Sequence, residues 1–559
     1  MKFKGLAKYF PTIIKYLLCF VFFSYIFIYF PSKKYMLTWL CEMTLIACTT
    51  NIIMVPKSED KHATLRRVLG RIFNTLTTLL MLIQLTVFHF SNSYISLVMM
   101  TNLDNLKDQT GRISYFVTVG IIILISIIPV EYFAIIKPGE SGEEAAYLKN
   151  RLISILIINF CLVVIGGMTY YFEREMSTAF AYINLITQNN ERIAREMSQD
   201  TSVNITSEFY HYSIDDMISR PDTLDENPNI IIVMTEGMSS NIIEDERCIM
   251  PRMKELAENS ISFDNYYNHT FATYRGISGQ LYSGFQNNNY DINTLTSIMS
   301  ITGDLGYHTI FINTEPDNVT FDEYLDILGF DDILTADSTV TGAIACVPDS
   351  EAYQLLYETI EKENETGTPY LIVMYTFCTH NSFDSPDQVY ENGSVNTYNR
   401  FYNADYHFGT FFDKWSENEL SDNSLFIMTT DHATYSDLEY ATAFPEHYNE
   451  RPAANIDEIP FIMWHKGVEP AVYDANGRNS LDLVPTILDY ADIDAENYFL
   501  GNSLFSKIGT DYDIIFHTDG FIYSTNKGHV NVLTGVQEDD YWDQLYRYFT
   551  AKEQSPERP

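Results

Sequence analysis

Basic residues are scarce in this 559-residue chain. It holds 35 Lys+Arg against 74 Asp+Glu, which gives a formal net charge of −39 at pH 7. A protein this acidic repels nucleic-acid phosphates and anionic lipid faces, because like charges oppose close approach. The composition therefore excludes nucleic acid as a partner and excludes docking to a membrane through a polybasic patch.

Cysteine is also scarce, with seven in the whole chain. Four lie in long apolar stretches near the N-terminus, and the other three are Cys248, Cys346 and Cys378. Three cysteines cannot all pair with one another, which excludes a disulfide-rich scaffold. Cys378 lies two residues before His380, but a buried thiol at a strand end explains it better than a catalytic nucleophile does.

Long apolar runs, in contrast, are plentiful. Five stretches are long enough to cross a bilayer, at about residues 12–30, 35–55, 72–90, 114–131 and 152–171. Lys and Arg gather before the first stretch, between the second and third, and between the fourth and fifth. The positive-inside rule then places the N-terminus in the cytoplasm and everything after the fifth stretch outside. We expect a multi-pass protein of the cell membrane, with a five-helix transmembrane domain at 1–171, a connector at 172–228 and an extracellular domain at 229–559.

The extracellular domain alternates strand and helix patterns. The strand patterns are short apolar runs, namely NIIIVM, HTIFIN, PYLIVMYT, NSLFIMTT, IPFIMW and YDIIFH, and helical patterns occur at about 350–364, 397–417 and 480–491. This alternation is typical of an α/β domain in which helices cover both faces of a mostly parallel sheet.

Candidate metal ligands follow two of these strands. Glu236 comes directly after NIIIVMT, Asp431 and His432 come directly after NSLFIMTT, and Thr273 lies in FATYRG. Reactive groups gather at the carboxyl ends of strands in open α/β sheets, so we expect these side chains to meet. Two carboxylates, an imidazole and a hydroxyl suit one divalent metal, with Mn²⁺ expected and Mg²⁺ or Zn²⁺ as alternatives. For the Asp-His pair taken alone, an ordinary loop is the simpler explanation.

Thr273 is the candidate nucleophile. A hydroxyl attacks poorly unless a metal or a base lowers its pKa, and the predicted metal would do so. Tyr274 to Leu281 is expected to begin a helix, so a phosphate at Thr273 would lie near a positive helix end and beside Arg275. Arg275 is therefore a candidate substrate ligand, with a structural ion pair as the alternative.

Several longer motifs follow one another in order. They are NIIIVMTEG, Thr273-Tyr274-Arg275-Gly276, Gly306-Tyr307, Leu328-Gly329-Phe330-Asp331, TFCTHNSF, NADYHFGTFF and LDLVPTILDYADI. From about residue 225 to 510 the chain thereby resembles the lipoteichoic acid synthase family of phosphoglycerol transferases, membrane proteins of the alkaline phosphatase and sulfatase superfamily. The resemblance implies a sulfatase-like fold with Glu236, Thr273, Asp431 and His432 as metal ligands. It also implies that Thr273 is the nucleophile and that His380 contacts the phosphate or protonates the leaving oxygen.

The same resemblance implies an activity. Glycerophosphate would move from a membrane phospholipid, phosphatidylglycerol, through a covalent intermediate on Thr273 to a glycolipid, polymer or glycan acceptor of the cell envelope. The chain departs from the family where many members carry a Trp-x-Arg that grips phosphoglycerol, because it has Val319-Thr320-Phe321 there, and it has Ala433 in place of a usual glycine.

These departures keep two alternatives open, a phosphoethanolamine transferase and a membrane sensor or binding protein with a degenerate site. Sulfate hydrolysis is not expected, because the Cys or Ser motif that yields formylglycine is absent at the nucleophile position and Thr cannot be converted in that way.

Overall fold

The structure, a computed structural model, describes residues 33–54, 62–91, 177–198 and 201–559, apart from 291, 342–343, 382, 454–455, 513–514, 519–520, 526–529 and 534–535, together with a few isolated residues before 177. The chain divides into two compact units, one made of residues 1–97 and 112–190 and the other of residues 98–111 and 191–559. This division falls inside helix α7 (Thr178–Ser198). The domain boundaries expected at residues 171 and 228 stay predictions.

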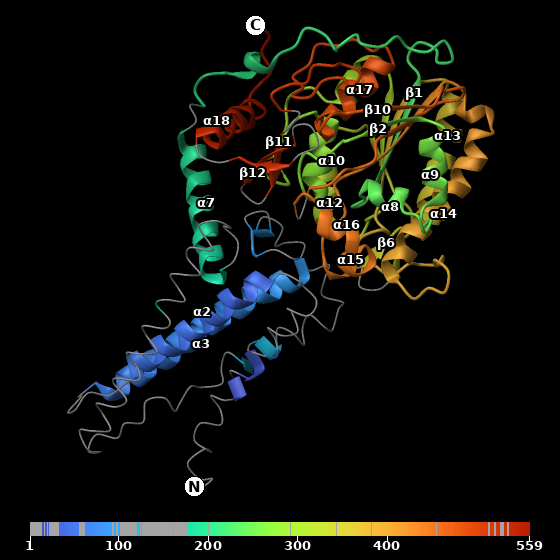
Figure 1. Ribbon diagram of the computed structural model, residues 1–559. Coiled ribbons are helices and arrows are strands. Elements are labelled where there is room, and N and C mark those ends of the chain that lie inside the picture. The colour runs from blue at the N-terminus through green and yellow to red at the C-terminus, as the bar shows by residue number, and fades with distance from the viewer. Residues whose placement is uncertain are drawn as a thin grey trace, which may run out of the picture. The chain divides into compact units, whose positions relative to one another are not determined.

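In the first unit, helices α2 (Lys33–Met54) and α3 (Ala63–Ser91) pack against each other (Figure 1). Glu42 of α2 accepts hydrogen bonds from the Thr178 N–H (3.2 Å) and hydroxyl (2.8 Å), which fastens the start of α7 to α2. Within the described residues, Thr64–Phe88 is the one helical segment long and apolar enough to count as a candidate membrane span. The first, fourth and fifth predicted spans lie largely outside the described residues, so the five-helix domain and its multi-pass topology stay predictions.

The second unit is the α/β domain. Its helices are η4 (Thr206–Phe209), α8 (Ser240–Glu244), α9 (Pro251–Glu258), α10 (Thr273–Leu281), α11 (Ile298–Asp304), α12 (Val319–Leu325), α13 (Asp349–Thr366), α14 (Asn396–Ser416), η5 (Glu419–Ser421), α15 (Leu438–Ala443), α16 (Pro445–Glu450), η6 (Ser480–Asp482), α17 (Leu483–Tyr490) and α18 (Val536–Ala551). Its strands are β1 (Asn229–Thr235), β2 (Ile261–Asp264), β3 (His308–Ile312), β4 (Asp332–Leu334), β5 (Thr339–Thr341), β6 (Ile344–Cys346), β7 (Tyr370–Thr376), β8 (Ser424–Thr430), β9 (Ile462–Trp464), β10 (Ala471–Asp474), β11 (Ile515–Thr518), β12 (Phe521–Ser524) and β13 (Asn531–Val532).

Eight strands form the main sheet, in the order β10-β2-β9-β8-β1-β7-β3-β4. Five of its neighbouring pairs are parallel, and only the two pairs that involve β9 are antiparallel. The prediction of a mostly parallel sheet is therefore confirmed. Strands β11 to β13 form a separate antiparallel sheet, and β5 and β6 form a two-stranded one.

Both faces of the central strands are buried. Along β1, Ile230, Ile232 and Met234 enter one apolar cluster together with residues of α10, α11, α12 and α17. Ile231 and Val233 point to the opposite face and pack with residues of α8, α9, α13 and α14. These four helices lie on the same side of the sheet (Figure 1). Successive side chains of a strand point to opposite faces, so an apolar run without alternation is what a two-sided core requires.

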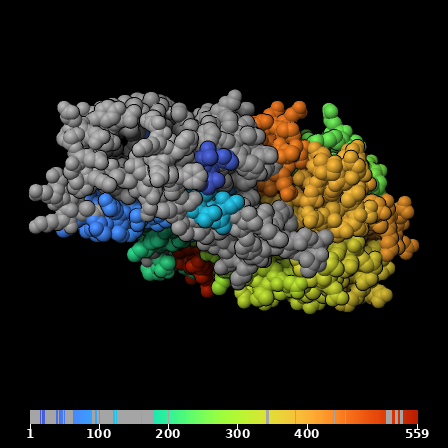
Figure 2. Space-filling model, turned by 90° about the horizontal axis from the view of Figure 1, so that it is seen from below, coloured from blue at the N-terminus to red at the C-terminus, as the bar shows by residue number. Residues whose placement is uncertain are grey.

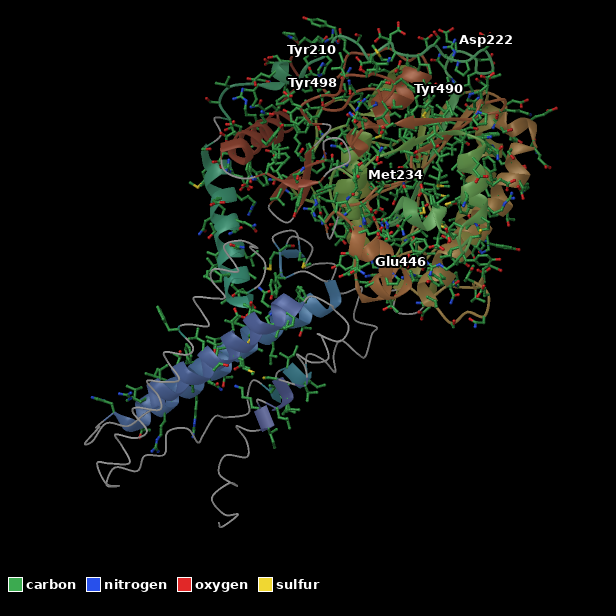
Figure 3. All side chains as sticks on the ribbon, viewed as in Figure 1. Tyr210, Asp222, Met234, Glu446, Tyr490 and Tyr498 are labelled. Atoms are coloured by element: carbon green, nitrogen blue, oxygen red, sulfur yellow. The ribbon has the colours of Figure 1, made fainter. Side chains whose placement is uncertain are left out.

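The burial of a side chain depends on where its element lies in this layered unit. Met234, near the end of β1, lies in the interior of the unit, whereas Glu446 of α16 lies at its periphery (Figure 3). Helices α13 and α14 pack against each other and supply part of the outer surface, seen in yellow to orange in the space-filling view (Figure 2).

The three central strands end in register. Thr235 of β1 pairs with Thr376 of β7 on one side and with Thr430 of β8 on the other. The residues that follow these strands therefore emerge together at one edge of the sheet.

Candidate metal and nucleophile site

Glu236, Asp431 and His432 converge at the carboxyl edge of β1 and β8. One ligand atom from each of these three buried residues lies within 4.8 Å of the other two. The Nε2 atom of His432 is 3.5 Å from Glu236 Oε1 and 3.4 Å from Asp431 Oδ2. The sequence placed these residues at the ends of separate strands, and the parallel register brings them to one point.

Hydrogen bonds fix the direction of each side chain. Asp431 Oδ1 accepts from the backbone N–H groups of Gly237 and His432, both at 2.8 Å. His432 Nδ1 is 2.8 Å from the Ala433 carbonyl oxygen, which can only accept, so this nitrogen carries the proton. In the neutral imidazole, Nε2 is then the nitrogen with the lone pair, and it is the one that faces the two carboxylates.

These donors fit a divalent cation. Asp431 Oδ2 is fully buried and has no hydrogen-bond partner among the described residues. Burial and the neighbouring Asp431 raise the pKa of Glu236 well above its ordinary value. It costs free energy to bury an unpartnered carboxylate oxygen beside a second carboxylate and an imidazole lone pair. A bound cation would offset this cost by neutralising their charge. Carboxylate oxygens with an imidazole nitrogen suit Mn²⁺, Mg²⁺ or Zn²⁺.

Thr273 lies at the first position of α10 and joins this cluster. Its hydroxyl donates a hydrogen bond to Glu236 Oε2 at 3.1 Å. Ala272, just before it, has φ +89°, a conformation that costs a non-glycine residue roughly 1–3 kcal/mol and is found mostly where function requires it. Thr273 is partly exposed, whereas Glu236, Asp431 and His432 are buried, so Thr273 is the most exposed member of the cluster.

Close packing holds α10 against the loop that carries the Asp-His pair. A Cβ atom built on Gly276 would lie 2.2 Å from the Asp431 carbonyl oxygen, so only glycine allows this approach. The Gln280 side-chain amide, one turn further, donates to the Thr430 carbonyl oxygen at 2.9 Å. Two elements far apart in sequence thereby hold Thr273 in place over the carboxylates.

The structure places Arg275 and His380 close to this chemistry but in different settings. Arg275 is buried and donates to the Phe271 carbonyl oxygen at 3.0 Å, within the segment that carries Thr273. His380 is half-buried in the turn after β7, where its ring stacks on Phe377 with centroids 4.8 Å apart. The adjacent Thr379 donates to the Glu236 carbonyl oxygen at 2.6 Å. Substrate binding by Arg275 and His380 stays a prediction.

Tyr375 is a site residue that the sequence did not indicate. Its buried phenol donates a hydrogen bond to Glu236 Oε2, the same oxygen that Thr273 contacts. Burial and the Glu236 charge raise the pKa of Tyr375 well above its ordinary value, so the phenol stays protonated and remains a donor. In PYLIVMYT this tyrosine differs little from its apolar neighbours, and only the pairing of β7 with β1 reveals its role.

Comparison with known proteins shows which chains and folds this protein is similar to. The family model for sulfatases matches residues 228–493. The lipoteichoic acid synthase-like protein YvgJ of Bacillus subtilis (strain 168) is 22% identical over 420 residues, and the match covers 66% of each protein, slightly less than two thirds of YvgJ.

Two solved structures are also similar. The integral membrane protein lipooligosaccharide phosphoethanolamine transferase A of Neisseria meningitidis shares the fold, with a TM-score of 0.50, 13% identity, and coverage of 91% of this chain and 97% of that one. The lipoteichoic acid synthase LtaP of Listeria monocytogenes matches with a TM-score of 0.48 and 16% identity, over 63% of this chain and 96% of its own. The sulfatase match, the relationship to YvgJ and the ordered motifs together support a protein of the lipoteichoic acid synthase type, with a sulfatase-like domain over residues 228–493.

Proposed function

We propose that this protein is a membrane-anchored, metal-dependent phosphotransferase that moves glycerophosphate from phosphatidylglycerol to an acceptor of the cell envelope. The observation that carries the proposal is the hydrogen bond of the partly exposed Thr273 hydroxyl to Glu236, beside the unpartnered oxygen of Asp431 and the lone pair of His432. This arrangement suits a nucleophile held next to a cation.

The chain supplies the ligands and the geometry. Glu236, Asp431, His432 and the Thr273 hydroxyl would hold the metal, with Mn²⁺ expected. A cation in this position lowers the pKa of the hydroxyl and withdraws charge from the phosphate oxygens. Tyr375 holds Glu236 in place, and the Gly276 contact holds α10 against the Asp-His loop.

The proposed reaction has two steps. Thr273 Oγ attacks the phosphorus of the lipid, its proton is directed at Glu236 Oε2, and the bond from phosphorus to the diacylglycerol oxygen breaks. His380 is the proposed donor of the proton that the leaving oxygen takes up. In the second step an acceptor hydroxyl attacks the phosphorus on Thr273, and its proton passes to His380. The bond from phosphorus to Thr273 Oγ breaks, and the proton held at Glu236 returns to restore the Thr273 hydroxyl.

Phosphoethanolamine transfer is the second candidate, and one observation favours it. The segment from Asn313 to Asp331, which takes the place of the Trp-x-Arg segment, contains several acids and no Lys or Arg. Glu315 in this segment is close enough to raise the pKa of both Glu236 and Tyr375. Negative charge beside the nucleophile is more compatible with a cationic head group than with glycerol alone.

Labelled lipids test both candidates. The full chain in membranes is incubated with phosphatidylglycerol or phosphatidylethanolamine labelled in the head group, and the peptide that contains Thr273 is examined by mass. A glycerophosphate adduct supports the main proposal, and a phosphoethanolamine adduct selects the second candidate.

Two variants control this experiment. Thr273→Ala should lose the adduct and lipid cleavage but still bind metal, because three ligands remain. Thr273→Ser should keep part of the activity, because the hydroxyl survives. Near-normal lipid cleavage by Thr273→Ala would refute the covalent mechanism, and a chain without stoichiometric metal would favour the membrane sensor with a degenerate site.

A further inference from the structure

Two cysteines meet beside the site, although neither belongs to it. The Sγ atoms of Cys346 and Cys378 are 3.7 Å apart, and both side chains are fully buried. Cys346 is the last residue of β6, and Cys378 lies two residues beyond the end of β7. In sequence they are separated by α13 and the whole of β7.

Backbone contacts hold both segments independently of the thiols. The Val347 N–H, directly after Cys346, donates to the Thr314 carbonyl oxygen at 2.8 Å. On the other side, Thr379 follows Cys378 and binds the Glu236 carbonyl oxygen. The two sulfurs therefore face each other because of the fold. A disulfide needs an S–S separation of about 2.05 Å, so the sulfurs must approach by about 1.7 Å, which small side-chain rotations can supply.

The thiol surroundings do not suit a nucleophile or a redox catalyst. Burial, together with Cys346 and Asp349, raises the pKa of the Cys378 thiol well above its ordinary value. Reactive cysteines are instead partly exposed and have a lowered pKa. Cys378 Sγ contacts the Val347 carbonyl oxygen at 3.9 Å and is also hydrogen-bonded with Asp349.

We propose that Cys346 and Cys378 form a structural disulfide in the mature protein. Each thiol loses one proton and one electron, and the Sγ–Sγ bond forms. An external disulfide, carried by an oxidoreductase or by a small-molecule thiol pool outside the cytoplasm, accepts the two electrons and two protons and becomes two thiols. Because the buried pair is sealed in the folded domain, the bond forms while the exported chain is folding.

The bond would brace one wall of the site. It closes a loop that contains α13 and β7, and it ties the end of β6 to the turn that carries Thr379 and His380. A disulfide stabilises mainly by restricting the unfolded chain. Cys248 is exposed and remains the unpaired cysteine of the described part of this unit.

Differential labelling tests the bond directly. The full chain is extracted from membranes without reductant, denatured in the presence of a maleimide, then reduced and treated with iodoacetamide. Cys248 should carry the maleimide, and Cys346 and Cys378 should carry only the second label. Before reduction, the two peptides should appear as one linked species lighter by two hydrogens than their sum. Maleimide on both Cys346 and Cys378, or linkage of either one to Cys248, would overturn the proposal.

Thermal unfolding tests the structural role. Reductant should lower the Tm of the wild-type chain and of Cys248→Ala by about 5 °C, from the closure of a loop of this length in a domain of this size. The Cys346→Ala/Cys378→Ala double variant should unfold at the same temperature with and without reductant. If reductant leaves the wild-type Tm unchanged while the double variant folds, the bond has no bracing role.

Discussion

Asp431 combines two opposite tasks in one side chain. Its Oδ1 accepts from the backbone N–H groups of Gly237, after β1, and His432, after β8, whereas its Oδ2 is buried with no hydrogen-bond partner among the described residues. One oxygen therefore serves the fold and the other is left for a cation. A substitution that removes the charge of Asp431 but keeps the shape of its side chain separates the structural role from metal binding.

Asp431→Asn should abolish tight metal binding and leave the fold intact. The amide oxygen can still accept from Gly237 and His432, while a ligand charge is lost, and even a partner outside the ligand set costs roughly 10–100-fold in affinity. Metal content and calorimetric titration measure the loss. Asp474→Asn, at an exposed position of β10, is the matched control and should bind metal normally. Stoichiometric metal in Asp431→Asn at wild-type affinity would show that the ligand assignment is wrong.

Tyr375→Phe should weaken metal binding and activity by roughly 10–100-fold, because Glu236 loses a donor that fixes its orientation. Tyr370→Phe is the control on the same strand, since its hydroxyl contacts Asn364 instead of the site. Tyr375 acts through Glu236, so raised metal concentration should rescue much of the lost activity. An unchanged metal affinity in Tyr375→Phe would remove this tyrosine from the site.

The sequence could predict Glu236, Thr273, Asp431 and His432 because each lies next to a recognisable strand or motif. Tyr375 and Gln280 could not be predicted in this way. Their contribution depends on which strands are neighbours and on which turn of α10 faces the Asp-His loop, and a single sequence does not specify either.

At the scale of elements, the long buried strands β1, β3, β7 and β8 and helices α13 and α14 were all predictable. Strands β2, β4 and β10 were missed because they are short and only partly apolar, with alternating or exposed patterns. IPFIMW was recognised as a strand, but β9 runs antiparallel, and YDIIFH gives β11 in the separate small sheet. Strand direction and sheet membership arise from connections that local patterns do not encode.

Gly276→Ala should separate α10 from the loop of Asp431. The added Cβ would overlap the Asp431 carbonyl oxygen, so the helix must shift and carry Thr273 with it. We expect a loss of at least about 2 kcal/mol of stability and little remaining activity, because overpacking of rigid backbone is rarely absorbed. Chemical denaturation and the lipid-cleavage assay measure the two effects.

Gly303→Ala is the matched control for this change. Gly303 lies in α11, and nothing stands within 4 Å of a Cβ built there. This variant should be neutral or more stable by about 0.5–1 kcal/mol, as expected for alanine in a helix. If Gly276→Ala and Gly303→Ala had the same stability and activity, the close contact between Gly276 and the Asp431 carbonyl oxygen would not be important.

The junction of α9 and α14 should give the stability a pH dependence. Asp405 of α14 accepts from the N–H groups of Arg252 (3.0 Å) and Met253 (2.7 Å), and burial raises its pKa from 3.8 to about 7. The folded state therefore holds a proton that the unfolded state has already released above pH 4. Protonated Asp405 therefore adds to the free energy of unfolding. The addition is complete below the pKa of Asp405 in the unfolded state and is lost as the pH rises through 7.

Between pH 6 and 8 the loss from Asp405 should be about 1 kcal/mol. Urea unfolding at several pH values measures it in the wild-type chain and in Asp405→Asn, which does not ionise. As the pH rises, the wild-type chain should lose stability relative to Asp405→Asn. A constant difference across this range would contradict the raised pKa.

At the scale of the whole molecule, the topology is the prediction with the widest consequence. The Lys and Arg pattern places the N-terminus inside and the α/β domain outside. A reporter fused after residue 200 should be active only outside the cytoplasm, and a reporter fused near Arg67 only inside. The reverse pattern would remove the lipid donor from the reach of Thr273.

The order of the central strands has a consequence for how the protein comes to be active. Strand β1 receives one neighbour from β7 and the other from β8, and the Asp-His pair arrives only with β8. A chain that emerges N-terminus first therefore exposes Glu236 and Thr273 long before it can assemble the metal site. If the domain is exported as proposed, the chain has no complete set of the proposed ligands until residue 432 has been synthesised and translocated, and until then it could not cleave the lipids of the membrane that it crosses. In the proposed exported transferase, the interleaved strand order would thus delay catalysis until strands β1, β7 and β8 have all crossed the membrane.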